Sequence, residues 1–301
     1  MPRQWFSQMT SANKISIETT DAVIGARVFG ISLANQPDNK TVHLIEKALE
    51  KYGVLIFPEQ QMTPRQQVAF SAAFAPLELT ELEKARLPDV EEIFVVGNVG
   101  DDLVSFSPET EDQELEWHTD HIHRQTPARA SLLYAKEVPQ QGGDTLFACM
   151  YHAFDALGES QKQEYCTLQA VNSGSGLEEY LVRQNLDKTN SSGQRRSHDQ
   201  VIWPLVRAHP DTGRKALYFG NQVTIGIVGK SAAQAQQFVA ELTEHACQPA
   251  FRYRHHWSVG DAVLWDNRRV LHAGTTYDVV NTRRLMHRTT WRETTPIEMC
   301  D

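Results

Sequence analysis

The sequence predicts a mainly β fold, a sandwich or jelly roll with helices on its flank. Short segments rich in β-branched and aromatic residues recur along the chain, and Gly, Asp or Pro separates them. They do not alternate strictly with helical segments, which disfavours a doubly wound parallel sheet. Many short strands of this kind favour a two-sheet architecture. The predicted strands are EIFVVG, SLLYAKEV, DTLFACM, KALYFG, FRYRHHW, DAVLW and RLMHRTTW.

The first helix is predicted by one apolar stripe near the start of the chain. In TVHLIEKALEKY, apolar side chains recur at helical spacing at Leu44, Ile45, Ala48, Leu49 and Tyr52. The glycine that follows is expected to end this helix. VLIFP then indicates a short buried strand that its proline closes.

Two further helices have clear sequence signals. The second is expected to begin after Thr63 as N-cap, with proline at its first position and Gln66 placed for a capping box. The last strong helix is SAAQAQQFVAELTEHA, with Phe238, Val239 and Leu242 facing inward. Shorter helical pieces are expected around MYHAFDALGES and SQKQEYC.

Two long stretches, 98–116 and 171–202, are predicted to be loops because Gly, Ser, Asn, Asp and charged residues dominate them. Structureless loops longer than about 12–15 residues are usually functional lids or mobile insertions. We expect lids over a site, and a tolerated insertion is the alternative. No linker composition divides the chain, so residues 1–301 are predicted to form one domain.

Composition narrows the class of protein. The 301 residues carry a formal net charge of -9, which argues against non-specific binding to nucleic acid or anionic lipid. No apolar run is long enough to span a membrane, and the N-terminus lacks the apolar core of a secretory signal. Cys149, Cys166, Cys247 and Cys300 are scattered, which argues against a disulfide framework. We expect a soluble, cytoplasmic protein.

The most informative local pattern is Trp117-His118-Thr119-Asp120. Successive residues of a strand face opposite sides, so His118 and Asp120 are expected on one side with Thr119 on the other. His272, just after a predicted strand, is the best candidate for a third ligand. Two histidines and a carboxylate on one face of an octahedron form the facial triad of non-haem Fe(II) oxygenases. For an isolated pair, a solvated His–Asp hydrogen bond is the alternative.

Two arginines on one predicted strand indicate anionic ligands. In TRRLMHRTTW, Arg284, Met286 and Arg288 share one face, with Leu285 and His287 on the other. Guanidinium groups are costly to bury without anions and are suited to bidentate carboxylate recognition. A surface strand whose arginines meet solvent is the alternative interpretation.

These motifs together resemble those of a known family. WHTD, GGDTLF, LWDNRRVLHAGTTYD and RRLMHRTT occur in the same order in the taurine dioxygenase/TfdA-like family of Fe(II)- and 2-oxoglutarate-dependent dioxygenases. The resemblance extends over most of the chain, including GVLIFPEQQMTPRQQVAFSAAFAPLE near the start. It implies a double-stranded β-helix, a jelly roll of the cupin kind, with helices supporting one sheet.

The resemblance also assigns roles to individual residues. It implies that His118, Asp120 and His272 bind iron. It places the Thr145 hydroxyl and the Arg284 guanidinium on the distal carboxylate of 2-oxoglutarate. The implied activity is oxidation of a C–H bond with O2 as co-substrate and with succinate and CO2 as products. Hydroxylation is the expected outcome, and desaturation or ring closure would use the same ligands.

Substrate recognition is expected to involve Arg288, which matches the family position for the substrate's anionic group. Family members commonly carry Asn where this chain has Glu114, and Glu78, Glu81 and Glu83 follow the early motif. These acidic residues predict a small anionic acid or a zwitterionic acid that also carries an amine. A solvated acidic loop is the alternative.

Two other functions compete with the oxygenase. A zinc-dependent hydrolase would need further ligands at short spacing, such as HxH, and the sequence upstream of WHTD has none. A non-catalytic metal-binding jelly roll would have no reason to combine the triad with the arginines. By family resemblance, we also expect a homo-oligomer, either a dimer or a tetramer.

Overall fold

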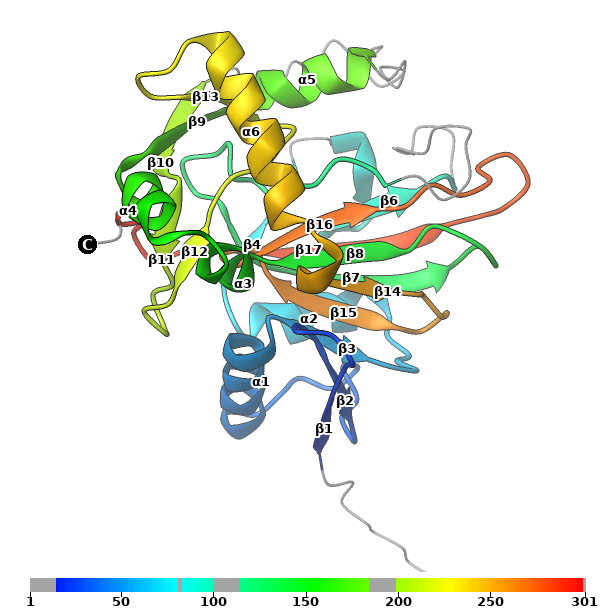
Figure 1. Cartoon of the computed structure of the whole chain (residues 1–301). Helices are drawn as coiled ribbons and strands as arrows, with labels where there is room; N and C mark the ends of the chain where they lie inside the picture. Colours follow the sequence, from blue (N-terminus) through cyan, green and yellow to red (C-terminus); the bar gives the residue numbers. More distant parts are fainter. Residues whose placement is uncertain (1–14, 81–82, 100–113, 184–198, 300–301) are drawn as a thin grey trace, which may run out of the picture.

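The computed structural model describes residues 15–80, 83–99, 114–183 and 199–299. Within them, strands make up the centre of the molecule, and helices cover one face and one end (Figure 1). The jelly-roll prediction is confirmed, because two facing sheets enclose the main core. The predicted loops at 98–116 and 171–202 lie partly outside the description, at 100–113 and 184–198.

The largest sheet crosses the molecule and is antiparallel except where β2 runs parallel to β3. Its central strands are β15, β7 and β17, and β4 pairs with the far end of β17. In sheet order the strands are β1 (Ser16–Thr19), β2 (Ala26–Phe29), β3 (Val54–Phe57), β15 (Ala262–Asp266), β7 (Ala128–Glu137), β17 (Leu285–Arg292), β6 (Val90–Gly97) and β5 (Arg86–Leu87), with β4 (Leu77–Glu78).

A second sheet faces the first across the core, and smaller sheets extend from one end. The second sheet consists of β14 (Arg252–His255), β8 (Thr145–Cys149) and β16 (Val270–Gly274). The smaller sheets consist of β10 (Gln200–Pro204), β9 (Gln169–Ser173) and β13 (Thr224–Ile227), and of β11 (Val206–Ala208) with β12 (Lys215–Leu217).

The three clearly predicted helices are present as α1, which begins two residues before the predicted segment, α2 and α6, whereas α5 lies where a loop is predicted. Asp38 caps α1 by accepting a 2.7 Å bond from the Thr41 amide, and Gly53 ends it in the left-handed conformation at φ 71°. Thr63 and Gln66 form the predicted capping box of α2. The helices are α1 (Asn39–Tyr52), α2 (Pro64–Ala72), α3 (Met150–Asp155), α4 (Glu159–Thr167), α5 (Gly174–Arg183) and α6 (Ala232–Ala246), with 3-10 turns at Glu83–Ala85 and Pro249–Phe251.

The prediction of a continuous loop over 171–202 is wrong for its described parts. Residues 171–173 belong to β9, α5 follows at once, and β10 begins at Gln200. The strand β9 was not predicted because a polar residue, Asn172, occupies a buried position in it. The Asn172 side chain accepts a 2.7 Å hydrogen bond from the Thr224 hydroxyl. A strand that buries a hydrogen-bonded asparagine lacks the apolar pattern on which sequence analysis depends.

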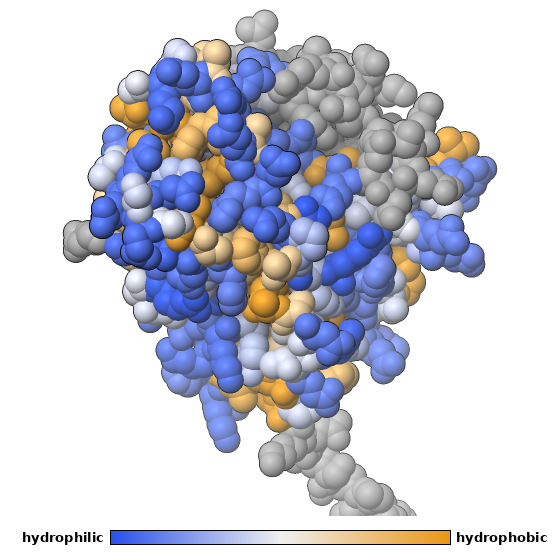
Figure 2. All heavy atoms as spheres, in the orientation of Figure 1, coloured by the Kyte–Doolittle hydropathy of each residue, from blue (hydrophilic) through white to orange (hydrophobic). Residues whose placement is uncertain are grey.

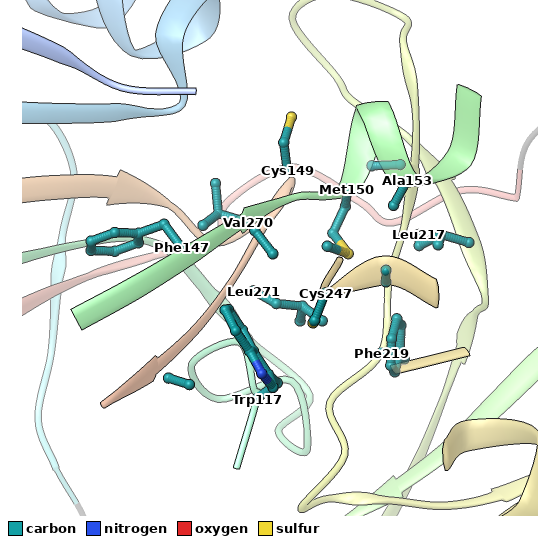
Figure 3. Packing of buried hydrophobic residues seen from close by; sticks show 14 of the residues in the cluster. Trp117, Phe147, Cys149, Met150, Ala153, Leu217, Phe219, Cys247, Val270 and Leu271 are labelled. Carbon is teal, nitrogen blue, oxygen red and sulfur yellow. The ribbon is translucent and has the colours of Figure 1, made fainter. Parts of the chain in front are cut away.

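The two faces of the large sheet meet different cores. Alternate residues of β7 and β15 point inward to the second sheet, where Leu133 and Trp265 join a cluster with Phe147 of β8. Figure 3 shows part of this inner core, with side chains from β8, α3 and β16. The opposite residues, such as Leu132 and Leu264, pack against α1 and α2. The metal-binding pattern faces the inner core, and α1 and α2 support the sheet from behind.

The surface is mainly polar. Hydrophilic side chains cover most of the face in Figure 2, and apolar side chains occur in small scattered groups. In the part of the chain that the structure describes, no helix combines the length and apolarity needed to cross a bilayer.

The burial of His287 predicts that the protein loses stability in acid. It is buried on the α2-facing side of β17, and burial, aided by Lys136, lowers its pKa to about 4. The unfolded histidine titrates near 6.5. Between these values the unfolded chain binds one more proton than the folded chain, so stability falls as the pH drops from about 6.5 to about 4.

We expect His287→Gln to reduce this acid sensitivity. The measurement is the change in urea midpoint between pH 7 and pH 5 for both proteins, which cancels any effect of the substitution at neutral pH. Equal changes in the two proteins would contradict the role assigned to His287.

Candidate metal centre

The two candidate histidines lie side by side because their backbones pair. The segment before Asp120 forms two antiparallel bridges, one from His118 to His272 in β16 and one from Glu114 to Thr275 just after β16. The His118 amide donates to the His272 carbonyl at 3.0 Å, and the reverse bond is 2.8 Å long. The two ring centroids are therefore 4.2 Å apart, although 153 residues separate them in the chain.

Asp120 completes the group from the start of a turn. One of its oxygens, Oδ2, lies 3.9 Å from Nε2 of His272. Atoms of His118, Asp120 and His272 that could bind a metal all lie within 4.8 Å of one another. Thr119 turns away, and its hydroxyl donates to the Asn267 carbonyl at 2.7 Å. The sequence-predicted triad is thus brought together at one point between the two sheets.

The protonation states of these groups suit a metal. Burial lowers the pKa of His118 and of His272, so both imidazoles are neutral at neutral pH. Burial alone would raise the pKa of Asp120, but the Arg288 guanidinium beside it outweighs burial and holds that pKa well below its usual range. The site therefore offers two neutral nitrogens and one ionised carboxylate.

Hydrogen bonds also fix which atoms are available. Nδ1 of His118 lies 3.0 Å from the Glu116 carbonyl, which can only accept, so the proton is on Nδ1 and Nε2 keeps its lone pair. Nδ1 of His272 is buried without a partner among the described residues. Two imidazoles and one carboxylate that share a face are the donor set of a facial triad. The residues present fit a divalent metal ion.

Arg284 lies just before β17 and is also buried, which lowers its pKa. Its Nε donates to the Gly143 carbonyl at 3.1 Å, and its amide donates to the Asn98 side chain at 2.8 Å. Among the described residues, no carboxylate forms an ion pair with Arg284. A buried guanidinium without a carboxylate partner favours the binding of an anion from outside the chain.

A glycine makes the position of Arg284 possible. Gly97 has a φ of 149°, and a Cβ atom there would lie 1.8 Å from the Arg284 carbonyl oxygen. Gly142 and Gly143 adopt positive φ, as the predicted tight turn requires. Thr145 follows this turn at the start of β8, and its buried hydroxyl accepts a 3.0 Å bond from the Trp257 indole. Arg284 and Thr145 are therefore linked through the same turn.

Arg288 contacts the candidate ligand itself. Its Nη1 donates to Asp120 Oδ1 at 2.6 Å, and its guanidinium carbon lies 4.7 Å from the centroid of the Phe94 ring. The sequence predicts only a substrate contact for Arg288. The structure adds an ion pair that balances the charge of Asp120.

Glu114 has partners within the protein. Its Oε1 pairs with Arg252, and its Oε2 accepts a 3.2 Å bond from the Trp117 indole. Glu78 likewise pairs with Arg124 and Arg292. Glu81 lies outside the described residues. The proposed cation contact of Glu114 thus competes with an arginine, so the geometry does not favour it.

The residues that hold Asp120 were not predicted from the sequence. Ser131 of β7 donates to Asp120 Oδ2 at 2.7 Å, and the Asp120 amide donates to Asn267 Oδ1 at 3.2 Å. Asn267 belongs to the LWDN motif, which is the one sequence signal that could have found it. A single serine within a strand carries no such signal.

Comparisons with known proteins agree with this geometry. The family model described as "Taurine catabolism dioxygenase TauD, TfdA family" matches residues 16–290. The chain is 36% identical over 275 residues to an (S)-phenoxypropionate/alpha-ketoglutarate-dioxygenase of Sphingobium herbicidovorans, covering 90% of this chain and 93% of that protein. It is 35% identical over 280 residues to an alpha-ketoglutarate-dependent 2,4-dichlorophenoxyacetate dioxygenase of Cupriavidus pinatubonensis, covering 89% and 94%.

Solved structures match over similar lengths. A taurine dioxygenase from Burkholderia xenovorans has a TM-score of 0.77 and 28% identity, covering 94% of this chain and 90% of that one. AAD-2 in complex with Mn(II) and N-oxalylglycine has a TM-score of 0.76 and 31% identity, covering 95% and 100%. None of these relatives supports a zinc-dependent hydrolase or a non-catalytic module. The chain therefore belongs to the TauD/TfdA family and is a 2-oxoglutarate-dependent dioxygenase.

Proposed function

We propose that this dioxygenase binds Fe(II) through His118, Asp120 and His272 and oxidises a C–H bond of a small aryloxyalkanoic acid. The observation that carries the metal assignment is the convergence of the three side chains within 4.8 Å. When bound, Fe(II) with 2-oxoglutarate and O2 supplies the oxidant, and succinate and CO2 are released. The protein's own residues bind, orient and exclude water.

Arg284 and Thr145 anchor the far carboxylate of 2-oxoglutarate in this proposal. Arg284 is buried, carries no ion pair within the described chain and reaches the turn that leads to Thr145. A guanidinium and a hydroxyl together suit a carboxylate, because both donate hydrogen bonds to its oxygens. The low exposure of both side chains strengthens these bonds.

Arg288 receives the carboxylate of the substrate through nitrogen atoms that do not contact Asp120. Its stacking on Phe94 places an aromatic ring beside this cation. The acidic residues that predicted an amine-bearing substrate, Glu114 and Glu78, are matched by arginines. An acid with an uncharged aromatic remainder therefore fits better, and the names of the two relatives at 35–36% identity support this class.

We also infer that residues 1–301 act as one dioxygenase domain, since the large sheet combines strands from both ends of the described chain. The lid role of 98–116 and 171–202 and the assembly into a dimer or tetramer stay predictions.

Removal of the metal is the direct test of the centre. We expect chelation to abolish succinate formation, Fe(II) to restore it and Zn²⁺ not to. Anaerobic Fe(II) with 2-oxoglutarate should give a weak visible charge-transfer band, and Asp120→Ala should lose both the band and succinate formation. Full activity of the Asp120→Ala variant would refute the assignment.

The anchor of 2-oxoglutarate is tested by a matched pair of neighbouring arginines. Arg284→Met should raise the half-saturating 2-oxoglutarate concentration by at least about 30-fold, because a buried charge contact is lost. Arg283→Met is the control, since Arg283 is exposed and pairs with Glu137 at the surface. Equal effects of the two substitutions would contradict the proposed anchor.

Substrate class is tested by a panel of acids. We expect phenoxyacetate and 2-phenoxypropionate to accelerate succinate formation above the rate without substrate, while taurine and α-amino acids do not. Oxygen uptake measured in parallel shows whether consumption is coupled to substrate. A preference for the amine-bearing acids would reject the aryloxy proposal and favour the zwitterionic substrate predicted from Glu114.

A further inference from the structure

A chain of buried hydrogen bonds ends on the carboxylate of Asp120. The Trp265 indole donates to Asn267 Oδ1 at 2.9 Å, and Asn267 Nδ2 donates to Ser131 Oγ at 3.0 Å. Ser131 Oγ then donates to Asp120 Oδ2 at 2.7 Å. The direction is fixed, because an indole N–H can only donate and a carboxylate can only accept.

The same asparagine holds the backbone of Asp120. Its Oδ1 accepts from the Asp120 amide at 3.2 Å, and its carbonyl accepts from the Thr119 hydroxyl at 2.7 Å. Trp265, Asn267 and Ser131 are each at most 1% exposed. Water does not reach these three side chains, so the loss of one hydrogen bond leaves a buried polar group without a partner.

The two oxygens of Asp120 have different donors. Arg288 contacts Oδ1, and Ser131 contacts Oδ2. Together they fix the plane of the carboxylate. Arg288 is also the residue expected to bind the substrate, whereas Ser131 lies in the inner face of β7 with no other hydrogen-bond acceptor than Asp120 among the described residues. Ser131 can therefore hold the carboxylate whether or not substrate is present.

We propose that Ser131 and Asn267 are positioning residues that orient Asp120 and thereby set the affinity of the metal centre. The inference rests on the proposed function, since it needs Asp120 to be a ligand. Neither residue touches the metal in this scheme. Groups that orient metal ligands typically change metal affinity by about 10- to 100-fold when removed.

The test is Mn(II) binding to Ser131→Ala, measured from the electron paramagnetic resonance signal of the free ion. We expect an affinity about 10- to 100-fold weaker than that of the original protein. Ser131→Cys keeps the size of the side chain with a weaker donor and should give an intermediate value. Thermal unfolding without metal checks that each variant is folded, and the cysteine variant carries the test should the alanine variant not fold.

A matched control is available where α2 packs against the same sheet. Ser71 and Thr289 share a 2.7 Å hydrogen bond between hydroxyls that are fully buried on the opposite face of β17. Ser71→Ala should lower the stability of the fold but keep the original Mn(II) affinity. If lower stability by itself weakened Mn(II) binding, this variant would bind Mn(II) more weakly as well.

The possible results distinguish the role of Ser131 from the existence of the metal centre. Unchanged affinity in Ser131→Ala and Ser131→Cys, or an equal loss in Ser71→Ala, would overturn the positioning role and leave the metal centre intact. Failure of the original protein to bind Mn(II) would overturn the metal centre, and with it this inference.

Discussion

The site depends on one backbone pairing, the antiparallel bridge between His118 and His272. Two hydrogen bonds between these residues bring their imidazoles together and seat the short segment before Asp120 against β16. Neither histidine could hold a metal alone. The pairing also ties the fold to the chemistry, because the second sheet supplies His272 and holds His118 beside it, while Ser131 and Arg288 of the large sheet contact Asp120.

Much of this could be predicted from the sequence because the signals are local or periodic. The capping box at Thr63 and the apolar stripe of α1 identify their helices directly. The alternation along β17 correctly places Met286 in the inner core and His287 on the other face. The triad was found because His118 and Asp120 are two residues apart and because the ordered motifs resemble those of a known family.

The remaining features depend on contacts that no local pattern encodes. Ser131 matters only because β7 places it beside Asp120, and a lone serine in an apolar strand gives no warning of that. The strand at Asn172 was missed because its buried side chain is polar and hydrogen-bonded to Thr224. Glu114 was expected to be available for substrate, but its partner Arg252 lies 138 residues away in the sequence. Pairing between distant residues decided each of these cases.

The ion pair between Arg288 and Asp120 has a consequence for how the enzyme is assembled. The two imidazoles are neutral and the Asp120 carboxylate is balanced by the Arg288 guanidinium, so these four side chains together are close to electroneutral. A divalent cation would add two positive charges to this group, beside the buried guanidinium of Arg284, and a dicarboxylate would offset most of that charge. Arg284 alone would attract one carboxylate, and the added charge of a bound cation would strengthen the hold on the keto acid.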